Sequence, residues 1–206
     1  MIVETFVTGP LETNTFLLYD RRGGEAIVID PGGETGAIVA RIKEQGLSLA
    51  AIVLTHGHFD HIGGNRELKK ATGAPILVHR ADEPMFSQAK ATADMFFVVS
   101  DNSPPADGYL EDGGEVKFGD ALLAVAHTPG HSPGGVTLIG EGRAFCGDLV
   151  FYGSVGRTDL PGGSQPELLK SIRERIMVLP EETILHPGHG PETTVGREKT
   201  QNPYFN

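Results

Sequence analysis

The chain has 206 residues, of which 39% are hydrophobic and 21% charged, and its formal net charge is −10. This length suits one domain over residues 1–206, and the excess of 27 acidic over 17 basic residues argues against nucleic acid as a partner. No apolar run approaches the roughly 20 residues that a membrane span needs, so no membrane association is expected. The first residues lack a basic, apolar leader, and a single cysteine cannot form an intramolecular disulfide, so the expected location is cytoplasmic.

Three strands are predicted at the start of the chain, over residues 2–7, 15–20 and 25–30, with turns at glycines between them. Residues 35–45 carry apolar side chains at helical spacing and stop at a glycine, which predicts a helix. The apolar run 49–54 predicts a buried strand. This strand, helix, strand unit places the residues after position 54 at the C-terminal end of a strand. Layered α/β folds often have ligand and metal sites at that end.

The middle of the chain is less regular. Residues 65–72 predict a helix with Asn65 as a possible cap, and residues 76–78 predict a short strand. From residue 80 to 109 the pattern loosens around several prolines and includes an apolar patch at residues 95–99. This patch is equally compatible with packing under a loop and with a mobile wall over a site.

The second half repeats short apolar runs with glycine-containing turns. These runs predict strands over residues 115–118, 122–126, 136–139 and 144–146, an amphipathic helix over residues 165–179, and a last short strand over residues 183–185. Two comparable β-rich halves, each followed by helices, predict an α/β fold of the four-layer αββα sandwich type, in the order helix, sheet, sheet and helix.

Residues 54–64 have the sequence LTHGHFDHIGG and hold the densest group of metal-binding side chains in the chain. His56, His58, Asp60 and His61 lie within six positions. Without a cation between them, these side chains would repel one another and be poorly solvated. The stretch therefore predicts half of a metal site.

Three later segments also end an apolar run with a metal-binding side chain beside glycine or proline, at residues 127–132, 146–149 and 185–189. Glycine permits close backbone approach and strand ends place side chains on one rim, so these segments could converge with the first cluster. Together with the THGHFDH run, which follows a T-H-x-H-x-D-H pattern, they resemble the metallo-β-lactamase superfamily over nearly the whole chain.

The resemblance implies a hydrolytic site with two metal ions. It implies a first ion held by His56, His58 and His131, a second ion held by Asp60, His61 and His189, and Asp148 bridging both ions. Two such ions, roughly 3.5–4 Å apart, can share one hydroxide. The expected ions are divalent, with zinc in first place and iron or manganese as alternatives, because imidazole and carboxylate ligands suit all three. Asp60 and Asp148 are also the candidate catalytic residues, although the sequence assigns no general acid.

Four further polar residues have alternative interpretations. His79, His127 and His186 are expected to lie beside the site or on the surface rather than to bind metal. Asp30, at the end of a predicted strand, is the preferred hydrogen-bond partner for a metal-binding imidazole, although turn formation explains it equally well. The lone cysteine, Cys146, is interpreted as a small buried residue on a strand.

Residues 147–159, GDLVFYGSVGRTD, resemble the same stretch of glyoxalase II-like (hydroxyacylglutathione hydrolase-like) proteins and of persulfide dioxygenases. The resemblance implies that Arg157 holds the glutathione part of a substrate, and a salt bridge to Asp159 is the alternative. True β-lactamases are disfavoured, because those of the commonest zinc type have cysteine at the position of Asp148. The chain departs from glyoxalase II after His189, where it lacks the tyrosine that contacts glutathione, and it lacks the long helical C-terminal extension.

The expected function is therefore metal-dependent hydrolysis of a small-molecule thioester, formed by glutathione or another small thiol. The alternative is a persulfide dioxygenase with a single Fe(II) held by His56, His131 and Asp148. A metal-binding module without catalysis is disfavoured, because seven ligands exceed what a structural zinc site uses. The acyl group, the thiol carrier and the oligomeric state are left open by the sequence.

Overall fold

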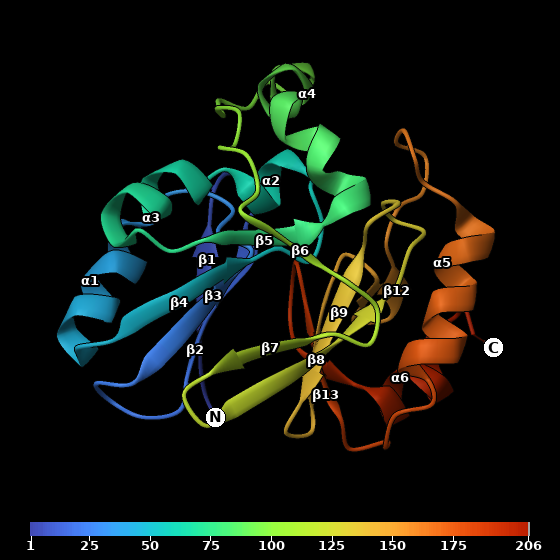
Figure 1. Ribbon diagram of the computed structural model, residues 1–206. Helices are drawn as coiled ribbons and strands as arrows, with labels where there is room; N and C mark the ends of the chain where they lie inside the picture. Colours follow the sequence, from blue (N-terminus) through green and yellow to red (C-terminus); the bar gives the residue numbers. More distant parts are fainter. Residues whose placement is uncertain (206) are drawn as a thin grey trace.

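Two six-stranded β-sheets form the centre of the computed structural model, which describes residues 1–205 (Figure 1). The first sheet has the strand order β1 (Ile2–Thr8), β2 (Thr13–Tyr19), β3 (Glu25–Ile29), β4 (Ser48–Val53), β5 (Ile76–His79) and β6 (Gly108–Leu110). The second has the order β14 (Thr193–Thr194), β13 (Ile184–Pro187), β10 (Arg143–Gly147), β9 (Val136–Gly140), β8 (Ala121–His127) and β7 (Glu115–Phe118). A small ribbon of β11 (Val150–Phe151) and β12 (Ser154–Val155) follows β10.

Strand direction changes within the first sheet. The pairs from β1 to β3 are antiparallel, whereas the pairs from β3 to β6 are parallel. Parallel neighbours need a crossover connection, and the helices α1 (Gly36–Gln45) and α3 (Asn65–Thr72) lie in the first two of these connections. As a result, β3, β4 and β5 all end at the same edge of the sheet, and the histidine-rich stretch starts at that edge.

The two sheets pack face to face because side chains alternate along each strand. In β2, Phe16 and Leu18 belong to the apolar cluster between the sheets, whereas Leu17 and Tyr19 belong to the cluster beneath the helices. Phe145 of β10 joins the cluster between the sheets, and its ring centroid lies 5.2 Å from that of Phe16. Because of this alternation, the central strands contribute side chains to two cores, one between the sheets and one beneath the helices.

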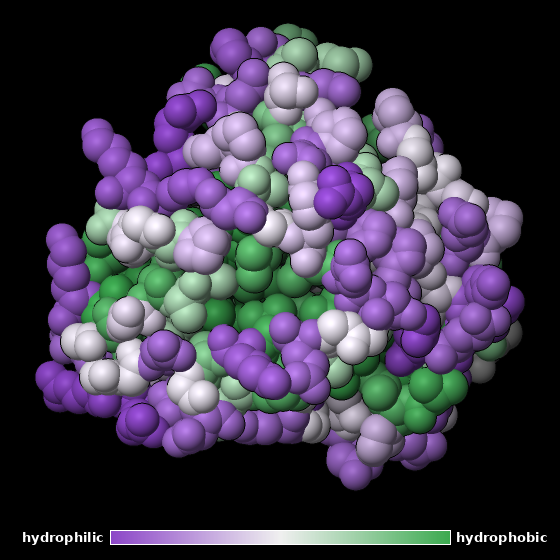
Figure 2. All heavy atoms as spheres, in the orientation of Figure 1, coloured by the Kyte–Doolittle hydropathy of each residue, from purple (hydrophilic) through white to green (hydrophobic). Residues whose placement is uncertain are grey.

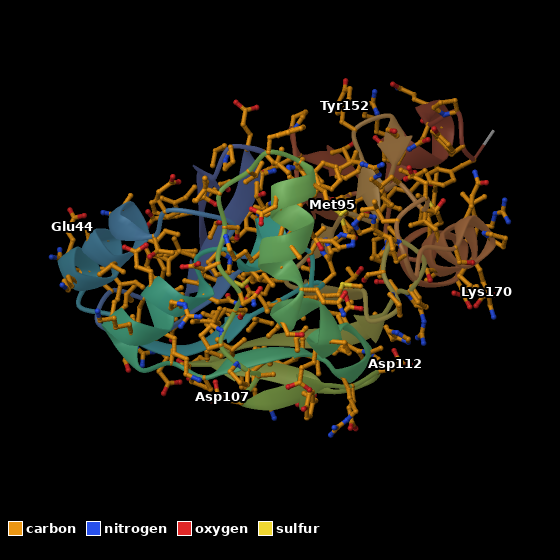
Figure 3. All side chains as sticks on the ribbon, turned by 90° about the horizontal axis from the view of Figure 1, so that it is seen from above. Glu44, Met95, Asp107, Asp112, Tyr152 and Lys170 are labelled. Atoms are coloured by element: carbon orange, nitrogen blue, oxygen red, sulfur yellow. The ribbon has the colours of Figure 1, made fainter. Side chains whose placement is uncertain are left out.

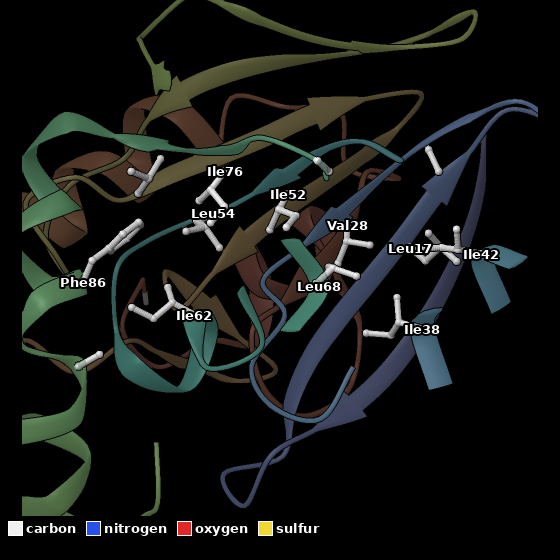
Figure 4. Packing of buried hydrophobic residues seen from close by; sticks show 14 of the residues in the cluster. Leu17, Val28, Ile38, Ile42, Ile52, Leu54, Ile62, Leu68, Ile76 and Phe86 are labelled. Carbon is white, nitrogen blue, oxygen red and sulfur yellow. The ribbon is translucent and has the colours of Figure 1, made fainter. Parts of the chain in front are cut away.

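Helices cover the outer faces of both sheets, which confirms the predicted αββα layers. On the first sheet, α1 and α3 pack through residues such as Ile38 and Leu68 against strand residues such as Val28 (Figure 4). On the second sheet, α5 (Gln165–Ser171) and the π-helical turn Ile172–Ile176 pack through Leu168 and Ile176, both fully buried.

Two predictions about local structure were wrong, and one helix was not predicted. The helix expected over residues 165–179 is α-helical only to Ser171 and ends in the π-helical turn, although its apolar face is the expected one. Asn65 does not cap α3, because it is the first helical residue and its side chain donates a hydrogen bond to Ser103 Oγ at 2.9 Å. The helix α6 (Val195–Gln201) has no counterpart among the predicted elements.

The irregular segment after β5 contains more structure than its sequence indicated. It forms a 3₁₀ helix (Arg80–Ser87), the helix α4 (Ala89–Met95) and then β6. Viewed from above, α4 lies across the junction between the two halves of the molecule (Figure 3). The apolar patch that follows is strongly exposed at Phe97 and Val99, whereas Val98 packs against the core. The segment is therefore partly packed and partly a projecting tip.

Hydrophilic side chains dominate the face shown in Figure 2, and apolar side chains gather in a band across its middle. Within residues 1–205, no helix has the length and apolar character needed to cross a membrane.

Candidate metal centre

The predicted metal-binding side chains come from four loops that all follow strand ends. His56 and His58 lie in the loop after β4, and Asp60 and His61 lie in the short helix α2 (Phe59–Ile62) that follows it. The other three side chains follow β8, β10 and β13, and they are His131, Asp148 and His189, respectively. The structure thus brings together all seven side chains, although they span more than half of the chain.

The seven side chains form two groups of three donors with one carboxylate between them. The first group is His56, His58 and His131, and the second is Asp60, His61 and His189; in each group the three donor atoms lie within 4.8 Å of one another. The side chain of Asp148 lies between them. Its Oδ2 is 3.6 Å from His131 Nε2 and 3.6 Å from His189 Nε2, and its Oδ1 is 3.3 Å from His61 Nε2.

Asp30 lies beside the second group, and its oxygens are already occupied. It accepts hydrogen bonds from the Thr55 backbone N–H at 2.7 Å, from Thr55 Oγ1 at 2.5 Å and from His61 Nδ1 at 2.9 Å. Although Asp30, His56 and His61 also form a close group of three, these bonds assign Asp30 the role of orienting an imidazole. The interaction expected of Asp30 is therefore present.

Hydrogen bonds fix the orientation of three further imidazoles. His131 Nδ1 donates to the Arg157 carbonyl at 2.8 Å, and His189 Nδ1 donates to the Leu11 carbonyl at 2.9 Å. His56 Nδ1 lies 3.1 Å from Thr55 Oγ1, and it acts as the donor because that hydroxyl gives its own proton to Asp30. Each of these rings consequently carries its proton on Nδ1 and keeps the lone pair of Nε2 for the centre.

The donor set fits divalent cations. His56 Nε2 is buried and has no hydrogen-bond partner among the described residues. Buried polar atoms are otherwise almost always paired, so this lone pair is explained if a cation accepts it. The short separations have the same explanation, since His58 Nδ1 lies 2.9 Å from His131 Nε2 and His61 Nε2 lies 3.3 Å from His189 Nε2. Five imidazole nitrogens and the carboxylate oxygens of Asp60 and Asp148 suit zinc, iron or manganese.

Electrostatics place most donors in the protonation state that a metal needs. Burial opposes ionisation of Asp148, but the nearby imidazoles, His61 foremost, outweigh it and lower the pKa of Asp148 far below its usual range. Burial and the neighbouring His131 lower the pKa of His58 to about 4, and burial likewise lowers the pKa of His56. These donors are thus a carboxylate and neutral imidazoles near neutral pH.

Like His189, whose pKa Asp60 and Asp148 raise against the effect of burial, His61 differs from His56 and His58. Its burial disfavours the charged form, but three carboxylates surround it, Asp148 contributing most, and they raise its pKa well above the ordinary value. A cation that binds the second group must therefore displace a proton from His61, because a ligand imidazole must be neutral.

Asp82 is a residue of the site that sequence reasoning missed. It is fully buried in the 3₁₀ helix after β5. Its Oδ2 accepts hydrogen bonds from the Gly57 N–H at 3.0 Å and Ser132 Oγ at 2.6 Å, and its Oδ1 accepts one from the Gly134 N–H at 2.6 Å. A Cβ on Gly57 would lie 2.7 Å from the Asp82 carbonyl oxygen, so the approach requires glycine. Asp82 thus joins the loop between His56 and His58 to the loop after His131.

Arg157 lies on the rim of a cavity of about 80 Å³ over the centre, which Asp60, His131 and Asp148 also line. Its guanidinium is paired with Asp159, with Nε–Oδ1 and Nη2–Oδ2 distances of 2.7 and 2.8 Å. The salt bridge considered as an alternative is therefore present, and the side chain still borders the cavity.

The remaining histidines and the cysteine lie outside the donor groups. His79 and His127 stack on each other at a centroid distance of 4.2 Å and are partly exposed. His186 is outside the donor groups, as expected, but it is fully buried in the core and stacks on Phe145, so the expectation of a surface position was wrong. Cys146 is buried on β10 as expected, and burial raises the pKa of its thiol to about 12.

Comparisons with known proteins agree with this geometry. Among curated proteins, the probable metallo-hydrolase YqgX of Bacillus subtilis is 40% identical over 201 residues, covering 96% of this chain and 94% of YqgX. Hydroxyacylglutathione hydrolase GloC of Haemophilus influenzae is 35% identical over 210 residues, covering 100% of this chain and 99% of GloC.

Two solved structures resemble the whole molecule. The B3 metallo-β-lactamase BLEG-1 superposes with a TM-score of 0.92 at 36% identity and covers 100% of both chains. TTHA1623 in a di-iron-bound form superposes with a TM-score of 0.90 at 40% identity, covering 98% of this chain and 100% of the other. The family model of the metallo-β-lactamase superfamily matches residues 8–189, which include all seven clustered side chains. The chain therefore belongs to the metallo-β-lactamase superfamily, in which its relatives include metallo-hydrolases.

Proposed function

We propose that this chain is a binuclear metal-dependent hydrolase that cleaves the thioester bond of a small molecule. The observation that carries the proposal is the presence of two groups of three donors with Asp148 between them. A structural zinc site closes four ligands around one ion, whereas seven donors shared by two ions leave coordination positions open for water and substrate. The 35% identity to a hydroxyacylglutathione hydrolase supports a thioester as the substrate.

The roles of the side chains follow from their positions. His56, His58 and His131 would hold the first ion, Asp60, His61 and His189 the second, and Asp148 would bridge them. Zinc is the first candidate, with iron and manganese as alternatives. When bound, two such ions supply a hydroxide nucleophile at neutral pH and polarise the carbonyl under attack.

Two clustered carboxylates, Asp60 and Asp148, are the candidate catalytic residues of the chain. Asp60 and Asp148 stay ionised because nearby imidazoles lower the pKa of each carboxyl, and both border the cavity over the centre. As carboxylates, both are available to hold the cations, while the carboxylic acid that forms when the tetrahedral intermediate collapses ionises in water at neutral pH. Since a thiolate is a good leaving group, no further side chain has to protonate it.

Arg157 is the proposed contact for a polar group of the substrate. It lines the cavity over the centre, and its partner Asp159 is largely exposed to solvent. Exposed ion pairs contribute little to stability, so a substrate carboxylate or carbonyl can take the place of Asp159 at small cost.

The test combines metal content with activity. Freshly purified protein should contain two metal ions per chain by plasma mass spectrometry. The zinc- or manganese-loaded form should release thiol, detected with a chromogenic disulfide, from S-lactoylglutathione or from simple acyl thioesters. Absence of thiol release from every substrate would contradict the proposal. One iron per chain, together with oxygen uptake on glutathione persulfide, would instead establish the dioxygenase.

The assignment of ligands has its own test. His131→Ala should remove the ion of the first group and leave that of the second, and His189→Ala should do the opposite. Cobalt titrations with visible spectra distinguish the two occupied groups. The ion retained in His189→Ala would bind the three imidazoles of the first group, whereas the ion retained in His131→Ala would bind the two imidazoles and the carboxylate of the second group. Two ions per chain in both variants would refute the pairing.

A further inference from the structure

Two hollows adjoin the cavity over the metal centre. One, of about 320 Å³, borders His58. The other, of about 290 Å³, borders Asp60. The first shares His58, Phe59, Thr92 and Leu160 with the central cavity and the second shares Leu11, Phe59 and Asp60 with it, so both hollows adjoin that cavity. A substrate whose reacting carbonyl lies over the centre can therefore place its acyl group in one hollow and its thiol part in the other.

The hollow beside His58 is apolar and carries no fixed charge. It lies between the segment 81–92 and the turn at residues 160–162. Its apolar lining consists mainly of Ala81, Pro84, Met85, Ala89, Leu160 and Pro161. No Asp, Glu, Lys or Arg is among its lining residues. We refer to it as the neutral groove.

The hollow beside Asp60 has the opposite character. Four carboxylates line it, those of Glu34, Asp60, Glu67 and Asp101, and no Lys or Arg does. A group that carries a carboxylate is repelled there, and an apolar chain would desolvate these acidic side chains without satisfying them. This hollow therefore suits a neutral polar or cationic group, and it leaves the neutral groove for the apolar part of a substrate.

We propose that the neutral groove binds the acyl group of the thioester, and that this group is an apolar, uncharged chain of several carbons. The inference rests on the proposed thioesterase activity and narrows its substrate class. Burial of one methylene group in an apolar site favours binding by up to about fourfold, so an acyl chain that fills the groove gains affinity with each carbon. An acyl group with a terminal carboxylate would lose its hydration in the groove without gaining a partner.

Gln88 offers a way to change the groove without touching the metal centre. It lines the groove, it is exposed, and it lies just before the first residue of α4. Ala91 is an exposed residue of the same helix that does not line the groove, so it provides the matched control. Gln88→Lys and Ala91→Lys add the same charge, but only the first adds it where the acyl chain would lie.

The experiment measures kcat/KM for acetyl, butyryl, hexanoyl and succinyl thioesters of one neutral thiol, N-acetylcysteamine. We expect kcat/KM to rise roughly two- to fourfold per methylene from the acetyl to the hexanoyl thioester. The kcat/KM of the succinyl thioester should be at least about tenfold lower than that of the butyryl thioester. Gln88→Lys should raise the ratio of kcat/KM for the succinyl thioester to kcat/KM for the butyryl thioester by about tenfold or more. Ala91→Lys should leave this ratio unchanged. A flat acyl profile, or equal effects of the two variants, would overturn the inference while leaving thioesterase activity intact.

A binding measurement separates this inference from the proposed function. Calorimetry with uncleavable S-alkyl thioethers of the same thiol should show Kd falling from methyl to hexyl in the wild type and in Ala91→Lys, and a weaker trend in Gln88→Lys. If no thioester is cleaved, the proposed function fails, and the thioether series still decides whether the groove binds apolar chains. A Kd that does not depend on chain length would refute the groove in either case.

Discussion

Two buried aspartates hold the metal centre in place without belonging to its donor groups. Asp30 accepts a hydrogen bond from His61 Nδ1, in the second group. Asp82 accepts from the backbone beside His56 and His58 and from Ser132, next to His131, so it serves the first group. Partners of this kind often change metal affinity by 10- to 100-fold when they are removed. The two aspartates should therefore be separable by mutation.

We expect Asp82→Asn to weaken metal binding at the first group by about 10- to 100-fold and to leave the second group nearly unchanged. The amide cannot accept hydrogen bonds with both of its polar atoms, so one of the three donors to Asp82 loses its partner and the two loops loosen. Competition titration with a metal chelator measures both affinities, and Asp30→Asn is the matched variant for the second group. Equal losses at both groups in Asp82→Asn would show that Asp82 acts only on global stability.

His186 makes a separate prediction about pH. It is fully buried, accepts a hydrogen bond from Arg143 at 3.0 Å, and burial together with that charge lowers its pKa to about 4. In the unfolded chain its pKa is about 6.5, so between these values the unfolded state binds more protons. The contribution of His186 to stability is therefore complete above about pH 6.5 and is lost as the pH falls toward 4.

His186→Gln should flatten the pH dependence of stability in that window, because glutamine keeps an acceptor for Arg143 but does not titrate. Urea unfolding of the metal-free protein between about pH 4.5 and 7.5 provides the measurement. The slope of the unfolding free energy against pH should be smaller in the variant by up to about one proton. The metal-binding histidines titrate in both proteins and cancel in the difference. Parallel curves would show that His186 is not the group responsible.

The seven clustered side chains could be predicted from the sequence, because four of them lie within six positions and the other three, His131, Asp148 and His189, each follow a glycine near a strand end. Asp82 was not, since its partners are 25, 50 and 52 positions away and its neighbours carry no pattern. His186 was misplaced for a related reason. Its position beside Pro187 resembles the other loop histidines, and only the packing of Phe145 and Phe16 shows that it belongs to the core.

Among the elements, strands were predicted more accurately than short helices. Burial on both faces forces apolar residues into β2 and alternation into β8, so their ends were placed within two residues. The helix α6 has no such pattern. It depends on buried Glu198, which accepts hydrogen bonds from Thr193 Oγ1 at 2.6 Å and from the Gly153 N–H at 3.0 Å. Isolated helices of this length are not stable, so distant contacts decide whether they form.

The end of α4 shows a conflict between sequence and local geometry. The Val98 N–H bonds to the Ala93 carbonyl and the Phe97 N–H to the Asp94 carbonyl, which is the Schellman arrangement. The residue after the helix cap in this motif is left-handed and is usually glycine. Here it is Phe97, with φ of 59° and 98% of its surface exposed. The side chain therefore adds strain without contributing buried surface.

Phe97→Gly should consequently stabilise the protein by about 0.5–1 kcal/mol, because relief of the left-handed strain exceeds the entropy that glycine adds to the unfolded chain. Thermal unfolding should shift upward by about 1–4 °C. Phe97→Ala is the control, since it removes the exposed ring but keeps the strain, and it should leave the midpoint nearly unchanged. A decrease in Tm for Phe97→Gly would show that the ring makes a stabilising contact.

At the level of the whole molecule, the metal centre joins the two sheets. The first half of the chain supplies four of the seven donors from residues 56–61, and the second half supplies His131, Asp148 and His189. Direct contacts across this junction include Asn14, whose N–H bonds to the Gly188 carbonyl at 2.7 Å and whose Nδ2 bonds to the Pro187 carbonyl at 3.0 Å. Cations at the centre would add a second connection between the halves.

Removal of metal should therefore lower the stability of the entire fold. A ligand that binds only the native state stabilises it by about 2.7 kcal/mol at a concentration 100 times its Kd, so two ions contribute at least about 5 kcal/mol under such conditions. Dialysis against a chelator should lower the thermal midpoint by about 10–20 °C, and zinc or manganese should restore it. His189→Ala, which should retain one ion, should fall between the two states. An unchanged midpoint after verified metal loss would mean that the sheets are held together by their apolar interface and by contacts such as those of Asn14 alone.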